Sequence, residues 1–310
     1  MSKLKKKYCI LTNDVELTSL VNHNLNLQTA DKVYDQGMRS LLKLYKKYGV
    51  KSTFFYTADI AIYNNDIVKM ILEDGHEVAS HGWVHESDQA FDVLSLEDQI
   101  DHLKKSKEVL EQISGQEVIS FRAPALRINE DTNTALTENG FLVDSSVSPQ
   151  RLDMFLSFGG LKKLSWVFAP RLPYLSDSKK LWKKGKGSIY EIPISAFGIP
   201  YIGTLLRITP ILTRLTRYLL HFENKFNHKP IVFLTHPNEF INEEKTAEKI
   251  KKRTKNPIKY FIGDVLRHKV KLKNLGDDAI PLYEKEIAFF HKKGYEFITC
   301  KEYYKLSLKN

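Results

Sequence analysis

The sequence has little cysteine and no long apolar run. Cys9 and Cys300 are the two cysteines among 310 residues, and both lie in segments typical of strands. Because free cysteine behaves as a small hydrophobic residue, we expect two buried thiols and no disulfide framework. No stretch is long and apolar enough to span a bilayer, and the apolar run after the basic N-terminus is too short for a signal peptide. We therefore expect a cytoplasmic protein.

The sequence also lacks internal repeats, low-complexity linkers and any aromatic and basic pattern typical of a nucleic-acid-binding module. Nucleic acid is therefore not an expected partner. The net charge of +10 instead favours another anionic partner, such as phosphates or a membrane surface. The length and the ordinary apolar content fit one large domain over residues 1–310, and they leave the oligomeric state open.

Apolar segments alternate with helical patterns along most of the chain. This alternation predicts parallel strands joined by crossover helices, an α/β fold in which functional residues sit where strands end. Strands are expected at 8–12, 53–56, 77–79, 118–121, 141–143, 189–194, 230–234 and 297–299. Helices are expected at 31–48, 66–72, 130–139 and 281–293, and between an N-cap at Ser95 and a stop at Gly115.

Four segments interrupt this rhythm. We expect residues 17–30 to form a loop over the mouth of the fold. Residues 150–188 are expected to form an insertion or long loop, and residues 243–278 an exposed and mostly basic helical excursion. The segment 199–222 is rich in Leu and Ile, and a helix from Pro210 would carry an apolar face made of Ile211, Leu215, Leu219 and Phe222. Two interpretations stay open for it: an outer helix of the fold, or an amphipathic element resting on a membrane surface.

Two histidines, His81 and His85, follow the strand expected at 77–79. Imidazole is the commonest protein ligand for metals, and two rings at this spacing can bind one zinc-like ion. A helical zinc-protease motif is not indicated, because residues 82–84 are Gly, Trp and Val and lack the inner glutamate that it needs. The pair therefore needs a third ligand from another part of the chain.

Polar side chains also follow the other predicted strands. Asp14 and Glu16 end the first strand, and an extended chain points them to the same side. Later strands end in further polar residues, Arg122, Asp144 and His236. Such a set suits metal-assisted hydrolysis: two imidazoles and a carboxylate hold an ion that acidifies water and polarises a carbonyl group, a second carboxylate serves as general base, and a separate histidine protonates the leaving amine. An arginine beside the base would hold it ionised.

The order of these motifs resembles the polysaccharide deacetylases, also called carbohydrate esterase family 4 or the nodulation-type deacetylase domain. The resemblance covers about residues 8–240 together with the final helix and strand, and the ordered series is far more specific than any single motif. It is carried by Asn13–Glu16, Ser52–Phe55, Gly75–His85, Phe121–Pro124, Asp144–Ser146, Glu191–Pro193 and Leu234–Pro237.

The resemblance implies a distorted, partly open (β/α) barrel of a single domain, TIM-like but with fewer than eight strands, namely seven. It implies a divalent metal, which we expect to be zinc although the ligand types also suit cobalt or iron. The first motif has the spaced Asp-Val-Glu form. By that match the metal ligands are Glu16, His81 and His85. The remaining residues would act on the substrate or on one another, with Asp14 as general base, Arg122 orienting it, His236 as general acid and Asp144 tuning His236.

The sequence departs from the family pattern at two places that affect the predicted roles of the site residues. Asn13 and Asp14 would also align with a first motif of two adjacent aspartates, in which case Asp14 becomes the metal ligand and the base is missing. The aromatic residue that often follows the Arg-x-Pro motif is replaced by Ala125, so the usual sugar-binding wall is not expected there.

The expected activity is therefore the metal-dependent removal of an N-acyl group, normally acetyl, from an amino sugar. The substrate would be a cell-surface glycan or its lipid- or nucleotide-linked precursor, and the segment 199–222 with the basic charge balance is consistent with peripheral contact to a membrane. Two alternatives stay open: an amidohydrolase for a small non-sugar amide, and a catalytically silent glycan-binding barrel.

Overall fold

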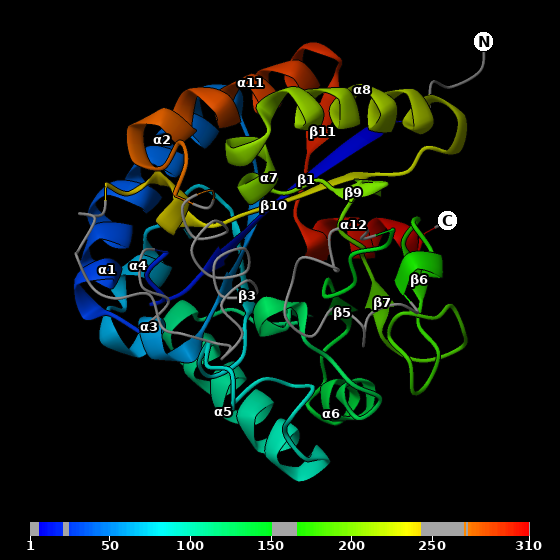
Figure 1. Ribbon diagram of the computed structural model, residues 1–310. Helices are drawn as coiled ribbons and strands as arrows, with labels where there is room; N and C mark the ends of the chain where they lie inside the picture. Colours follow the sequence, from blue (N-terminus) through cyan, green and yellow to red (C-terminus); the bar gives the residue numbers. More distant parts are fainter. Residues whose placement is uncertain (1–5, 21–24, 151–165, 243–269, 271, 310) are drawn as a thin grey trace, which may run out of the picture.

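A curled, largely parallel sheet occupies the middle of the molecule in the computed structural model, and helices cover its outer side (Figure 1). The structure describes residues 6–20, 25–150, 166–242, 270 and 272–309. Seven of the strands run parallel in the order β10-β1-β2-β3-β4-β5-β7. Their bounds are β1 Lys7–Val15, β2 Ser52–Tyr56, β3 Glu77–Ser80, β4 Ser120–Phe121, β5 Val143–Asp144, β7 Tyr190–Glu191 and β10 Ile231–Thr235.

Two further strands extend this wall. β6 (Tyr174–Leu175) pairs antiparallel with β7, and β11 (Tyr295–Phe297) pairs parallel with the start of β1. The barrel of seven parallel strands that the sequence predicts is therefore confirmed, with β6 and β11 as additions. Between β7 and β10 the wall continues through Ser195, whose backbone N–H donates to the carbonyl oxygen of Val232 at 3.1 Å. A short hairpin follows, formed by β8 (Ala196–Phe197) and β9 (Ile199–Pro200).

Helices connect the strands, as the alternation of patterns predicts. The N-cap at Ser95 accepts a hydrogen bond from the backbone of Asp98, and Gly115 ends that helix in the left-handed region, so both expected boundaries are confirmed. The helices are α1 Leu27–Lys32, α2 Arg39–Tyr48, α3 Ala58–Tyr63, α4 Asp66–Lys69, α5 Leu96–Ser114, α6 Thr132–Glu138, α7 Gly203–Ile208, α8 Pro210–Asn227, α11 Ala279–Lys292 and α12 Cys300–Ser307.

Several predicted boundaries shift by a few residues, and local capping explains two of these shifts. The loop expected at 17–30 ends early, because Asn26 caps α1 by accepting a hydrogen bond from the backbone of Gln28 at 2.8 Å. Helical structure then continues through a π-helical turn, Val33–Met38, into α2. The last strand ends at Phe297, since Thr299 and Glu302 form a capping box that starts α12. Both cysteines are buried and free, as expected.

The predicted insertions are described only in part. Residues 151–165, 243–269 and 271 lie outside the described residues, and with them most of the excursion expected at 243–278. The remainder of 150–188 contributes β6, so part of this segment belongs to the sheet. Within the described ranges, no helix combines the length and apolar character needed to cross a bilayer.

Two buried histidines, His76 just before β3 and His102 within α5, are expected to make the fold sensitive to acid. The Nδ1 atoms of His76 and His102 accept backbone hydrogen bonds from Ser52 and Trp83 at 3.1 and 3.2 Å, so protonation would remove both bonds. Burial lowers the pKa of each ring to about 4. The unfolded chain therefore binds more protons below pH 6.5, and the free energy of unfolding falls as the pH drops from about 6.5 towards 4.

From pH 7 to pH 5 each of these histidines should cost about 2 kcal/mol of stability. Urea unfolding followed by circular dichroism at the two pH values measures this loss. The variant His102→Gln removes one of the two titrating rings, and its stability should vary less steeply with pH than that of the wild type. A free energy of unfolding that is the same at pH 7 and pH 5 would contradict the prediction.

Candidate active site and metal centre

The polar residues predicted at the strand ends gather at one end of the barrel. Asp14 lies near the end of β1, and the guanidinium of Arg122, just after β4, donates to its Oδ1 at 2.8 Å. The Nε2 atoms of His81, after β3, and of His236, after β10, each lie 3.9 Å from Asp14 Oδ2. Because the strands are parallel, their carboxyl ends share one edge, and side chains far apart in the sequence meet there.

Three side chains beside Asp14 form a group that could hold a metal ion. Glu16, His81 and His85 each offer one ligand atom, and these atoms all lie within 4.8 Å of one another. The Oε2 atom of Glu16 lies 3.3 Å from Nε2 of His85. Two imidazoles and one carboxylate are the donor types of hydrolytic zinc sites, so the residues present fit such an ion. These are the three ligands that the resemblance implies.

The backbone around the histidines prepares both rings for this role. Nδ1 of His81 lies 2.7 Å from the carbonyl oxygen of Arg122. Since that oxygen can only accept, Nδ1 carries the proton and Nε2 keeps a free lone pair. Gly82 follows with φ +79°, where an added Cβ would meet the ring of Phe91 at 3.2 Å. The left-handed turn at Gly82 reverses the chain between the two histidines, so that the ring centroids of His81 and His85 lie 5.8 Å apart.

Burial keeps His81 neutral, as a metal ligand must be. It lowers the pKa of His81 to about 4, although Asp14 acts in the opposite direction. Burial also raises the pKa of Glu16, and the nearby histidines reduce this rise. A buried carboxylate with few compensating bonds is favoured by a cation placed next to it.

Asp14 differs from Glu16, because a buried cation already holds its charge. Burial alone would raise the pKa of Asp14, but Arg122, together with His81 and His236, outweighs this effect and lowers it. Arg122 is itself fixed by three further hydrogen bonds to two residues and by the ring of Phe55 at 4.3 Å; the bonds go to Thr12 Oγ1, Ser145 Oγ and the carbonyl oxygen of Ser145. Asp14 therefore stays ionised and oriented at neutral pH.

The neighbouring Asn13 faces away from this centre. Its amide donates to Ser52 Oγ and its oxygen accepts from Tyr45 Oη, both at 2.8 Å, within a buried network. The geometry therefore favours the pairing of Asp14 with Glu16 over the pairing of Asn13 with Asp14. The reason is the alternation of side chains along an extended strand.

Comparison with known proteins assigns the matching part of the chain to a family. Residues 22–143 match the family model described as polysaccharide deacetylase. A peptidoglycan deacetylase of Helicobacter pylori is 33% identical over 111 residues, which are 36% of this chain and 37% of the relative. Residues 22–143 are therefore similar to a polysaccharide deacetylase domain. The match includes His81, His85 and Arg122, whereas Asp14, Glu16 and His236 lie outside it.

Solved structures share the fold of this chain. A probable polysaccharide deacetylase from Pseudomonas aeruginosa PAO1 superposes with a TM-score of 0.57 at 15% identity, over 94% of this chain and 89% of the other. The PuuE allantoinase superposes with a TM-score of 0.58 at 14% identity, over 96% and 90%. The chain matches little more than a third of the length of the Helicobacter pylori relative.

The fold places a carboxylate, Glu239, beside His236, and the sequence did not point to it. Glu239 is buried, and its Oε1 lies 3.8 Å from Nδ1 of His236. Arg207 of α7 pairs with Glu239 at 3.3 Å, and this charge, against burial, lowers the pKa of Glu239 to about 2. Although burial favours the neutral ring, Glu239 and Asp14 raise the pKa of His236. Glu239 follows His236 by three residues, on a 3₁₀ turn at Pro237–Phe240, and this spacing is the one feature of the sequence that could have pointed to it.

Asp144 makes its contacts elsewhere. Its carboxylate accepts from the hydroxyl of Ser146 at 2.6 Å, and burial raises its pKa. The buried Glu191 lies next to it, and burial together with this like charge raises the pKa of Glu191 well above its usual value. No direct contact between Asp144 and His236 therefore supports the tuning role predicted for Asp144. The carboxylate that lies beside His236 belongs to Glu239.

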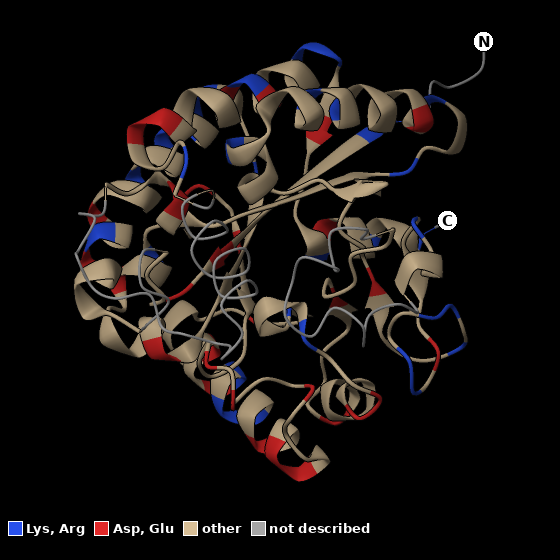
Figure 2. Cartoon of the chain, in the orientation of Figure 1, with Lys and Arg blue, Asp and Glu red and all other residues tan. Residues whose placement is uncertain are grey.

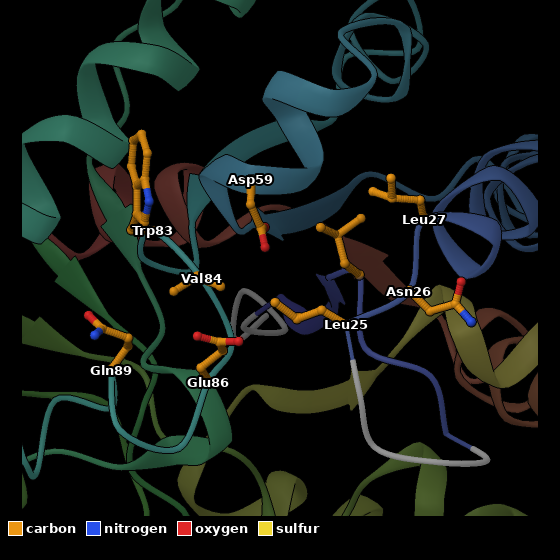
Figure 3. A pocket seen from close by; sticks show the side chains of 9 residues that line it. Leu25, Asn26, Leu27, Asp59, Trp83, Val84, Glu86 and Gln89 are labelled. Carbon is orange, nitrogen blue, oxygen red and sulfur yellow. The ribbon is translucent and has the colours of Figure 1, made fainter. Parts of the chain in front are cut away.

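A pocket of about 580 Å³ lies close to the candidate metal ligands in the chain, and Figure 3 shows the side chains that line it. Its wall includes chain neighbours of Glu16 and His85, and its lining residues are Leu17, Leu25, Asn26, Leu27, Asp59, Trp83, Val84, Glu86 and Gln89. The carboxylate of Asp59 points into it (Figure 3), and burial together with the charges of Glu16 and Glu86 raises the pKa of Asp59 to about 6. The pocket combines apolar surface with hydrogen-bond acceptors.

Proposed function

We propose that this domain hydrolyses the N-acyl amide, normally N-acetyl, of an amino sugar in a cell-surface glycan or in a lipid- or nucleotide-linked precursor, with a divalent metal, most readily zinc. The observation that carries the proposal is the ionised Asp14, held by Arg122, directly beside the potential ligand group of Glu16, His81 and His85. The similarity to a peptidoglycan deacetylase of Helicobacter pylori supports the same substrate class.

The residues divide the chemistry between them. A divalent ion held by Glu16 and the two histidines would polarise the amide carbonyl and acidify a water molecule. Asp14 accepts the proton of the attacking water, because Arg122 keeps its carboxylate charged and aligned. His236, whose pKa is raised, carries a proton that it can donate to the leaving amine nitrogen. The charge of Glu239, whose Oε1 lies 3.8 Å from Nδ1 of His236, favours the protonated form of this ring.

The pocket close to the candidate metal ligands in the chain offers room for the substrate. An indole such as that of Trp83 packs well against the apolar face of a sugar ring, and the carboxylates of Asp59 and Glu86 can accept hydrogen bonds from sugar hydroxyl groups. This combination of an aromatic ring and acceptor groups favours a sugar substrate over a small compact amide. A cytoplasmic location remains the expectation from the sequence alone.

Release of acetate from N-acetylated glucosamine oligomers by the purified chain tests the proposal. We expect turnover after addition of zinc or cobalt, and loss of at least about 100-fold after removal of the metal with a chelator. Allantoin and simple acetamides serve as comparison substrates. Hydrolysis of these compounds at equal rates would favour the small-amide alternative, and oligomer binding at full metal occupancy without turnover would favour a silent glycan-binding barrel.

A further inference from the structure

Helix α8 turns an apolar face outward. The residues Ile211, Leu212, Leu215, Tyr218, Leu219, Phe222 and Phe226 are between 43% and 74% exposed. Their spacing of three and four places them along one side of the helix. The helix does lie outside the barrel (Figure 1), as one of the two interpretations predicts, but the face formed by Ile211, Leu215, Leu219 and Phe222 is not the buried one.

The polar side of α8 packs onto the protein instead. Arg217 pairs with Glu286 of α11 at 2.9 Å, and His221 Nδ1 lies 2.9 Å from the hydroxyl of Tyr295 in β11. The other buried side chains of α8 include Thr213, Thr216 and Asn224. Specific polar contacts therefore fix this orientation. The apolar side stays largely exposed, although Tyr218 packs edge-on against Phe289 of α11, and among the described elements none exposes as many large apolar side chains.

Positive charge borders this face. Arg214 and Lys225 are exposed on the helix itself, and Glu223, its one acidic residue, is occupied by ion pairs with Arg171 and Lys229. Lys7, Lys225 and Lys293 lie close enough to His221 to act, after burial, in lowering its pKa. In Figure 2 α8 is tan over most of its length, with basic residues beside it. An apolar and aromatic face with a basic border complements an anionic bilayer surface.

We propose that the outer face of α8 docks this domain onto a membrane containing anionic lipid, with the helix lying in the plane of the interface. The apolar side chains would enter the boundary between headgroups and acyl chains, while lysines at the border reach lipid phosphates. A second copy of the chain fits the face less well, because two such faces would bring the basic borders of both copies together.

Docking through α8 would also bring the candidate active site to the membrane. α8 follows α7, whose Thr204 donates to Glu239 at 3.0 Å, so the N-terminal end of α8 lies at the end of the barrel that holds His236. An N-acyl amino sugar attached to a lipid would then reach the site from the same surface. This consequence rests on the proposed function, whereas the docking itself does not.

Flotation with vesicles tests the docking. The full chain is mixed at low salt with vesicles of phosphatidylcholine alone or with an equal part of phosphatidylglycerol. Binding is expected to the anionic vesicles and to weaken with salt. The double variant Phe222→Ser/Phe226→Ser should bind at least about tenfold more weakly. Ile62→Ser, which changes a 52% exposed apolar residue of α3, should bind like the wild type.

Further readouts separate the possible outcomes. Lys225→Glu should weaken binding to anionic vesicles about fivefold, at ~1 kcal/mol for each basic residue near the surface. Hydrolysis of a water-soluble substrate by the double variant should equal that of the wild type, so a failure of docking is distinct from a failure of the proposed function. Two results would overturn the proposal: no flotation of the wild type at low salt, or a lipid-free dimer that the double variant converts to a monomer.

Discussion

Asp14→Asn is expected to lower kcat for amide hydrolysis by about 10²- to 10⁴-fold, the usual contribution of a general base. The amide can still accept the bond from Arg122, so the ring of contacts around position 14 should persist. It cannot take a proton from water, however, and the chemical step loses its base. Steady-state kinetics on an N-acetylated oligomer measures the effect.

The metal content of Asp14→Asn distinguishes the two assignments of the first motif. If Glu16 is the ligand, the variant should bind as much metal as the wild type, as measured by mass spectrometry of the ion. Glu16→Ala is the matched comparison and should lose the metal. A variant Asp14→Asn that folds normally, by circular dichroism, but no longer binds metal would show that Asp14 is the ligand, and the assignment of the base would then be withdrawn.

His81→Ala should remove both metal and activity. His81 is buried, its Nδ1 is tied to the carbonyl oxygen of Arg122, and its Nε2 lies within the group of three ligand atoms. With one imidazole missing, Glu16 and His85 alone form a weak site, so we expect activity to fall to that of the chelated wild type. Binding of zinc measured by calorimetry and release of acetate provide two independent readouts.

His291→Ala is the control for this experiment. His291 is an exposed histidine near the end of α11, so its loss should change neither metal binding nor turnover. Full activity of His81→Ala under the same conditions would refute the metal assignment. Loss of activity with normal metal binding would instead point to an error in the ligand set, and His85→Ala would then be the next variant to measure.

Much of the site could be predicted because it depends on local sequence. The side of β1 that Asp14 and Glu16 share follows from the period of two in a strand, and the spacing of His81 and His85 is a property of one short segment. Parallel strands then bring their carboxyl ends to one edge whatever the details of packing. For the same reason the helix boundaries at Ser95 and Gly115 were predicted correctly, since caps are local.

The carboxylate beside His236 could not be assigned in this way. Asp144 ends a strand and Glu239 follows His236 by three residues, a spacing that by itself does not decide between the two carboxylates. The choice depends on where Arg207 of α7 is buried, because its charge keeps Glu239 ionised next to His236. Asp144, by contrast, contacts Ser146 within its own strand end. Partners of this kind are set by packing between distant elements.

The sequence by itself determined the alternating α/β pattern, the carboxylate pair and the histidine pair, since each arises from residue types at fixed local spacing. It also determined that α8 has an apolar side. Which side of α8 faces the barrel was decided only by the tertiary structure, because amphipathicity gives a direction relative to the helix axis and not relative to its neighbours. The contacts of Arg217 with Glu286 and of His221 with Tyr295 turn the polar side inward and leave the apolar side at the surface.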